Sequence, residues 1–273
     1  MAGAALFVVS VAAFWQEAAP EWAQAQARVR EIVAERLGPE RAADVPEGLQ
    51  QIWIEDLDRV DRCTTCHVTI DWGPELADAP HPARSHPAIP WLDKHPLEQF
   101  GCTICHGGQG AATTTAAAHG RVAFWEEPLL DSRRAKGYGL EASELMEMAC
   151  NYCHMQDTEV EGMPLLNAAK AFVKKKNCVR CHTIFGEGAT KAPDLSREGE
   201  KHATAYTFPR GWKQPHTALH WHIAHFREPF VVVPDSLMPT FILDGKQAEG
   251  LSLLVLSWRK QVLPARYVPQ PVR

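Results

Sequence analysis

All eight cysteines of the chain fall in one repeated pattern, in which two residues separate a pair of cysteines and a histidine follows the second. The four copies are Cys63-Thr-Thr-Cys66-His67, Cys102-Thr-Ile-Cys105-His106, Cys150-Asn-Tyr-Cys153-His154 and Cys178-Val-Arg-Cys181-His182. This pattern is the attachment signal for c-type haem, in which two thiols bond to the haem vinyl groups and the histidine binds the iron. The sequence therefore predicts four covalently bound haem c groups.

Two other chemistries use paired cysteines. Zinc can bind four thiolates from two such pairs, but a zinc site does not require a histidine after every second cysteine. A redox disulfide of the thioredoxin type is normally a single motif within a β-α-β context, which is not visible in this sequence. Haem is the interpretation that accounts for every cysteine and for the four histidines beside them.

The composition is that of a globular protein with room for large cofactors. The 273 residues are 45% hydrophobic and 22% charged, which excludes a disordered chain, a collagen and an all-membrane transporter. A net charge of -5 makes nucleic acid an unsuitable partner. Four haems leave about 68 residues for each, so the porphyrins must supply much of the apolar core. We expect a mainly α fold with extensive irregular loops.

The N-terminus predicts attachment to a membrane. Haem is attached covalently outside the bacterial cytoplasmic membrane, so the chain must cross it, and residues 1–15 are uncharged and apolar. A helix of about 15 residues covers about 22 Å, less than the roughly 30 Å hydrocarbon core. A cleaved signal peptide would need a basic start and a small-x-small cleavage site, which this segment lacks. We favour an uncleaved N-terminal membrane helix, completed by missing first turns or by partner subunits, with the haem domains on the periplasmic side.

Three regions follow from the patterning. Residues 1–40 are the membrane anchor and a periplasmic helix over 20–37, which starts at a proline and stops at Gly38-Pro39. Residues 41–140 are rich in Pro, Gly and His and form a loop-rich domain for two haems. Residues 141–273 hold two more haems and end in a class I-like cytochrome c domain, with helices at 165–176 and 246–262.

Each iron needs a second axial ligand, and histidine and methionine are the usual candidates. For the first two haems we expect two of His86, His95 and His119, with His81 in reserve. Met238 is the predicted ligand of the fourth haem, since it lies in a loop well after the last motif. For the third haem His225 is the first choice, within a stretch that also holds His220 and His222.

The last third of the chain resembles the monohaem cytochrome c subunit of cbb3-type oxidases, through Trp221-His222-Ile-Ala-His225 and Ser236-Leu237-Met238-Pro239. Along its whole length the chain resembles the membrane-anchored multihaem cytochromes c of bacterial Rieske/cytochrome b quinol-oxidising complexes. That resemblance is carried by the apolar segment before Pro20-Glu21-Trp22, by Gln51-Ile52-Trp53, by 60–67, by His95-Pro96 with 100–110, and by Ala118-His119.

The resemblance implies an electron carrier, not an enzyme: electrons would pass from a cytochrome b and a Rieske protein to an acceptor such as a soluble cytochrome c. A His/Met haem has a higher potential than a bis-His haem, so electrons are expected to run toward Met238. Two alternatives stay open. One is a multihaem reductase with one open iron position, and the other is a tetrahaem donor to a photosynthetic reaction centre.

Overall fold

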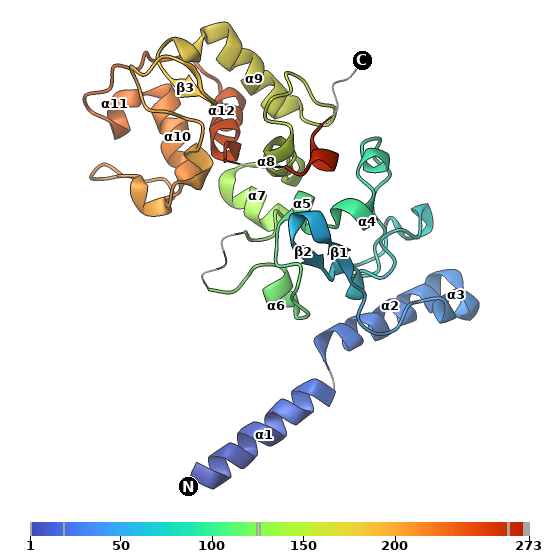
Figure 1. Ribbon diagram of the computed structural model, residues 1–273. Coiled ribbons are helices and arrows are strands. Elements are labelled where there is room, and N and C mark those ends of the chain that lie inside the picture. The colour runs from blue at the N-terminus through green and yellow to red at the C-terminus, as the bar shows by residue number, and fades with distance from the viewer. Residues whose placement is uncertain (1, 19, 124, 126, 261–262, 270–273) are drawn as a thin grey trace. The chain divides into compact units, whose positions relative to one another are not determined.

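The computed structural model describes residues 2–18, 20–123, 125, 127–260 and 263–269. Its contacts divide the chain into two compact units, Met1–Leu129 and Leu130–Arg273. Both are mostly helical with long irregular connections, and the described strands are short (Figure 1). The expected fold class of helices and irregular loops is confirmed.

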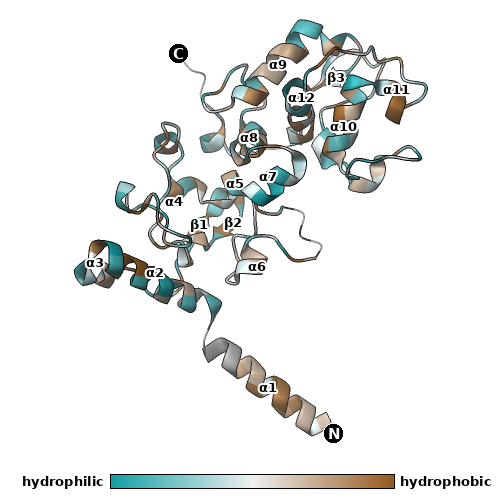
Figure 2. Ribbon diagram, turned by 180° about the vertical axis from the view of Figure 1, so that it is seen from behind, coloured by the Kyte–Doolittle hydropathy of each residue, from teal (hydrophilic) through white to brown (hydrophobic). Residues whose placement is uncertain are grey.

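The N-terminal helix α1 spans Ala2–Ala18 and is apolar over most of its length (Figure 2). Its side chains Leu6, Phe7 and Phe14 are each more than two-thirds exposed. Among the described residues, no helix is both long enough and apolar enough to cross a membrane. The sequence was right about a helix here, whereas its crossing of the membrane has no support in the structure.

Helix α2, Glu21–Leu37, begins where Pro20 is in extended conformation and ends at Gly38, whose φ of 92° places it in a conformation that favours glycine. Its buried face, Val29, Ile32 and Val33, packs within the first unit against residues that include Val45, Val68, Leu76 and Ala79. The predicted helix over 20–37 is therefore confirmed, and its apolar stripe finds its partner within the same unit.

The remaining elements of the first unit are short. Strands β1 and β2 pair antiparallel, with Ile52 opposite Asp61. Buried Gln26 of α2 ties this region together, because its amide donates to the carbonyls of Gly48 at 2.6 Å and Thr65 at 2.9 Å. The elements are α3 (Pro39–Ala43), β1 (Ile52–Ile54), β2 (Arg59–Asp61), α4 (Leu97–Phe100), α5 (Thr103–His106) and α6 (Thr115–Ala118).

The second unit is a helical domain around α12, Gly245–Ser257, which is buried along most of its length. A capping box starts α12: Asp244 accepts a hydrogen bond from the Gln247 N–H, and the Gln247 side chain accepts one from the Asp244 N–H. The core packed around it includes Met163, Leu166 and Leu219. The other elements are α7 (Ser132–Tyr138), α8 (Ala142–Cys153), α9 (Pro164–Lys176), β3 (Thr183–Ile184), β4 (Glu187–Gly188), α10 (Ala218–Arg227) and α11 (Pro229–Val232).

Two predicted helices of this unit can be compared with the structure. The helix expected over 165–176 is α9, which begins at Pro164. The helix expected over 246–262 ends at Ser257, so its last turn was wrongly predicted over the described residues 258–260; residues 261–262 lie outside the described residues. The chain turns because Trp258 becomes extended and buried, with its carbonyl accepting a hydrogen bond from Gly199 N–H.

Candidate functional site

The first two motifs are held together by one carboxylate. Asp61, at the end of β2, is fully buried and accepts hydrogen bonds from the N–H groups of Cys63 (3.0 Å), Cys102 (2.8 Å) and Thr103 (2.8 Å). Burial alone would raise the pKa of Asp61, but hydrogen bonds from Cys63, Thr103 and Cys102 outweigh it and lower the pKa. Asp61 is therefore a charged anchor for two attachment motifs that lie about forty residues apart in the sequence.

Gly101 lets the second motif approach this anchor. Its φ is 64°, and a Cβ placed there would come within 2.7 Å of Ile54 Cδ1 and 3.0 Å of Asp61 Oδ2. A larger residue there would be strained by the positive φ and would force the Ile54 or Asp61 side chain to shift.

The thiols of Cys63 and Cys102 are neighbours. One ligand atom each from Asp61, Cys63 and Cys102 lies within 4.8 Å of the others. A hydrogen bond between the two thiols is the main reason why the pKa of Cys63 is raised. Three atoms of this kind could hold a metal ion, although the Asp61 carboxylate already accepts three backbone N–H groups.

Each histidine of these motifs faces a second imidazole. The ring centroids of His67 and His81 are 5.9 Å apart and those of His106 and His86 are 6.2 Å apart, both edge-on, at 80° and 73°. Two imidazoles on opposite sides of one metal ion, with metal–nitrogen bonds of about 2.0–2.1 Å, have centroids about 6 Å apart. His86 Nδ1 lies within hydrogen-bond distance of the Pro87 carbonyl, at 2.8 Å, which leaves Nε2 for a metal. The residues therefore fit bis-histidine iron.

Burial is the main electrostatic influence on the motif histidines of the first unit. It lowers the pKa of His67 to about 4, with further lowering by the nearby rings of His81 and His119. It also lowers the pKa of His106, assisted by His86. Neutral imidazole is the form that binds iron, so this environment favours ligation.

The other two expected ligands of this unit are placed differently. His119 is close enough to His67 to shift its pKa. His95 directs Nδ1 to the Trp91 carbonyl at 2.8 Å, and its ring packs edge-on against Phe100 with centroids 4.8 Å apart. The ring contacts thus pair His86 and the reserve candidate His81 with motif histidines. The choice among His86, His95 and His119 stays a prediction.

The third motif lies at the C-terminal end of α8. Cys150 and Cys153 occupy its last turn, and His154 is the residue that ends it. His154 Nδ1 is 2.6 Å from Asp157 Oδ2. The ammonium of Lys170 in α9 donates to the carbonyls of His154 (2.7 Å) and Asp157 (2.8 Å). Burial lowers the pKa of Lys170 to about 8, although Asp157 opposes this shift.

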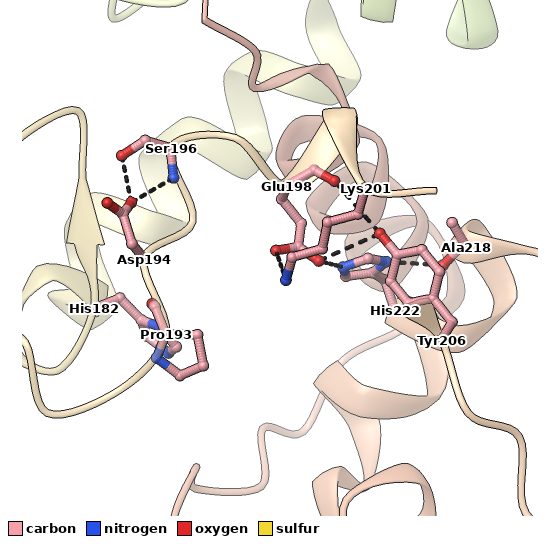
Figure 3. Close-up of polar contacts among 9 residues, drawn as sticks. All are labelled: His182, Pro193, Asp194, Ser196, Glu198, Lys201, Tyr206, Ala218 and His222. Atoms are coloured by element: carbon pink, nitrogen blue, oxygen red, sulfur yellow. Dashed lines mark hydrogen bonds and ion pairs between the residues drawn. The ribbon is translucent and has the colours of Figure 1, made fainter. Parts of the chain in front are cut away.

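The fourth motif follows α9, which ends at Asn177 with a left-handed φ of 53°. Cys178 begins a short 3-10 turn, and His182 Nδ1 lies 2.8 Å from the Pro193 carbonyl (Figure 3). Such a hydrogen bond fixes the ring orientation and leaves Nε2 for the iron.

A charged cluster around the buried Glu198 side chain fixes the loop after Pro193. Glu198 Oε2 pairs with Lys201 at 2.6 Å, while Glu198 Oε1 lies 3.2 Å from His222 Nε2 and 3.3 Å from the Tyr206 hydroxyl, which donates to it (Figure 3). Burial would raise the pKa of Glu198, but hydrogen bonds from His222 and Lys201 outweigh it and hold the pKa at about 2. We refer to Glu198, Lys201, Tyr206 and His222 as the Glu198 cluster.

The remaining candidate ligands lie on α10 and in the loop before α12. Both ring nitrogens of His222 have protein partners, since Nδ1 contacts the Ala218 carbonyl at 2.8 Å and Nε2 contacts Glu198. His225 stacks on Trp221 with centroids 4.9 Å apart. Its pKa is lowered to about 4, chiefly by burial and then by His222 and His182. Met238 is half-buried, and its N–H donates to Ser236 Oγ.

Three side chains that organise the motifs were not predicted: Asp61, Asp157 and Glu198. Asp157 has a visible signal, because it follows the motif histidine at a spacing of three residues in a helix-terminal segment. Asp61 stands two residues before Cys63, but its link to Cys102 depends on a contact distant in the sequence. Glu198 has no local signal, since its partner His222 lies twenty-four residues later.

The comparisons with known proteins agree with the fourth motif. Residues 166–257 match the family model for cytochrome c. No curated protein and no solved structure matched the chain. The matched segment runs from α9 to the end of α12 and contains Cys178, Cys181, His182 and Met238. The chain thus contains a cytochrome c domain, which implies covalently bound haem c and fits an electron carrier.

Proposed function

We propose that the chain is a tetrahaem cytochrome c that carries electrons from a membrane quinol-oxidising complex, with cytochrome b and Rieske subunits, to an acceptor on the periplasmic side. The observation that carries this proposal is the repeated construction of the four motifs. Each supplies two thiols and an imidazole, and in the first two a second imidazole lies at the separation that a shared iron requires. A bound haem supplies one-electron chemistry, and the protein supplies ligands, burial and spacing.

The residues of the first unit support rapid exchange between its two haems. Cys63 and Cys102, each the first cysteine of its motif, have adjacent thiols, so the points of attachment lie side by side. Asp61 holds both motifs by backbone hydrogen bonds and keeps these points in place. Nothing in this arrangement requires an open iron position, which favours a carrier over a multihaem reductase.

The ligand set that we propose uses His81 or His119 opposite His67, and His86 opposite His106. In the second unit we propose Met238 for the fourth haem and His225 for the third. His225 also interacts electrostatically with His182, so the fourth haem is its alternative position. His222 is left out of the set because both of its ring nitrogens are hydrogen-bonded.

Replacing His86 with alanine is expected to convert one of four ferric haems from low spin to high spin. The reason is that the variant would lose the imidazole whose ring centroid lies 6.2 Å from that of His106. Low-temperature electron paramagnetic resonance of the oxidised protein measures this change. His95→Ala is the matched control and should stay fully low-spin, because His95 packs against Phe100. A high-spin signal in His95→Ala alone would reverse the assignment.

The membrane attachment in this proposal depends on α1. It contains no basic residue, its apolar side chains are exposed, and its 17 residues extend about 26 Å, so its insertion would be completed by helices of partner subunits. Purification of the full-length protein from native membranes in mild detergent is expected to recover a cytochrome b and a Rieske protein with it. Exchange of residues 2–18 for a cleavable signal peptide, which keeps export and haem attachment, should abolish this co-purification while leaving the haem content unchanged. Recovery of the intact chain without any quinol-oxidising subunit would contradict the proposed partners.

A further inference from the structure

The histidine of the third motif has an unusual hydrogen-bond partner for this chain. His154 Nδ1 lies 2.6 Å from the carboxylate oxygen Oδ2 of Asp157. Both side chains are largely sheltered, with 20% of His154 and 34% of Asp157 exposed. A short hydrogen bond to an ionised acceptor is stronger than one to a neutral acceptor.

Two other motif histidines and the candidate ligands His86 and His95 make such a bond to a backbone carbonyl. His182 contacts the Pro193 carbonyl and His86 the Pro87 carbonyl, each at 2.8 Å. The Pro82 carbonyl plays the same part for His67. A carbonyl is neutral. Among these histidines only His154 therefore has a carboxylate next to Nδ1, the ring nitrogen that would not bind the iron.

The segment around Asp157 is fastened so that this contact is maintained. Lys170 donates to the carbonyls of both His154 and Asp157. Three residues further on, Val160 exchanges two hydrogen bonds with the Asn167 side chain, at 3.0 and 2.7 Å. Both Lys170 and Asn167 belong to α9. The ammonium of Lys170 opposes part of the carboxylate's field, but it donates its hydrogen bonds to carbonyl oxygens, which leaves Oδ2 to the imidazole.

From this geometry we infer that Asp157 is a positioning residue that lowers the reduction potential of the third haem. A carboxylate acceptor draws the Nδ1 proton away from the ring and makes Nε2 a stronger donor to iron. A stronger donor stabilises the ferric state relative to the ferrous state, and second-sphere hydrogen bonds of this kind are one of the means by which a protein sets haem potential. The inference rests on the proposed function, because it requires haem at Cys150 and Cys153.

The inference adds direction to the electron path. Within the second unit, the third haem has the carboxylate of Asp157 behind its histidine, whereas the fourth has the neutral Pro193 carbonyl. The third haem is then the lower-potential member of the pair when the two sixth ligands are of the same type, and Met238 on the fourth haem would widen the difference. Electrons pass from the third haem to the fourth.

The test is Asp157→Asn in the full-length haem-loaded protein. The amide keeps the size and a hydrogen-bonding oxygen but removes the charge. In a spectroscopically monitored redox titration, one of the four midpoint potentials is expected to rise so that its one-electron equilibrium constant changes at least tenfold, about 59 mV. The g-values of one low-spin ferric signal should shift in the same variant. Asp157→Glu keeps the charge and is expected to keep most of the low midpoint potential of the wild-type third haem.

Glu159→Gln is the matched control, because it removes one negative charge from an exposed side chain in the same segment. It should leave all four midpoints in place. Equal shifts in Asp157→Asn and Glu159→Gln, or no shift in either, would overturn the inference while four haems per chain kept the proposed function intact. If Asp157→Asn does not accumulate, Asp157→Glu is compared with wild type instead. The inference is contradicted if this variant folds with four haems but loses the low midpoint potential of the third haem and the corresponding low-spin ferric signal. Absence of haem from Cys150 and Cys153 in wild type would contradict the proposed function itself.

Discussion

Replacing Asp61 with alanine is expected to destabilise the first unit by about 4.5–9 kcal/mol, because hydrogen bonds to a charged group contribute about 1.5–3 kcal/mol each and three are lost. The three N–H groups of Cys63, Cys102 and Thr103 would be left without this acceptor in a buried place. Two of the four haems should then become partly high-spin as the two motifs separate. Chemical denaturation followed in the Soret band, together with electron paramagnetic resonance, measures both effects.

The control for this variant is Asp71→Ala, which removes an exposed acidic side chain from the same unit and should change stability by less than about 0.5 kcal/mol. The pKa of Asp61 is lowered in the folded protein, so its contribution to stability is present above its ordinary pKa and is lost as the pH falls through the folded value. Wild type should therefore lose more stability on acidification than Asp61→Ala. Identical denaturation midpoints for wild type and Asp61→Ala would show that the carboxylate is not the anchor.

Replacing Glu198 with alanine is expected to destabilise the second unit by about 3–6 kcal/mol, because the buried Tyr206 and His222 each lose a hydrogen bond of about 1.5–3 kcal/mol to a charged group. Lys201, Tyr206 and His222 all contact this carboxylate, so its loss leaves a buried network incomplete. The loop that carries the Pro193 carbonyl should loosen, and the midpoint potential of the fourth haem should change with it. Denaturation curves and a redox titration test the two consequences.

Glu187→Ala, at an exposed position in β4, is the matched control and should leave both the stability and the midpoint potential unchanged.

The pH dependence of stability gives a second check. The pKa of Glu198 is about 2 in the folded protein against an ordinary value of 4.5, so its stabilising contribution is complete above about pH 4.5 and is lost as the pH falls from there toward 2. Glu198→Ala should remove this part of the acid sensitivity. An unchanged acid-unfolding curve would contradict the role assigned to the Glu198 cluster.

The sequence predicted those features that depend on short-range chemistry. The helix over 20–37 could be predicted because Pro20 and Gly38 mark its ends, and the start of the helix before Cys178 was placed within one residue. The end of α12 could not be predicted, because it is set by burial of Trp258 and its contact with Gly199, far away in the sequence. Tertiary packing overrides local helix propensity at such a place.

The candidate site follows the same division. The cysteines and proximal histidines are local motifs, and the sequence shows all of them. The adjacency of Cys63 and Cys102 is not local, since it depends on Asp61 contacting two loops at once. The distal ligands could be predicted only in part. The sequence predicted His86 as a candidate, but it placed His81 only in reserve, although the His81 ring lies 5.9 Å from the His67 ring.

Intact-mass spectrometry with a pyridine haemochrome assay of the mature full-length protein tests the central claim most directly. The account predicts a mass increase of four haem groups per chain, with every cysteine consumed in a thioether bond and peptide fragments carrying haem at all four motifs. One haem only, attached at Cys178 and Cys181, with free or zinc-bound thiols at the other three motifs, would contradict it. The chain would then be a monohaem cytochrome c domain joined to a unit of different chemistry.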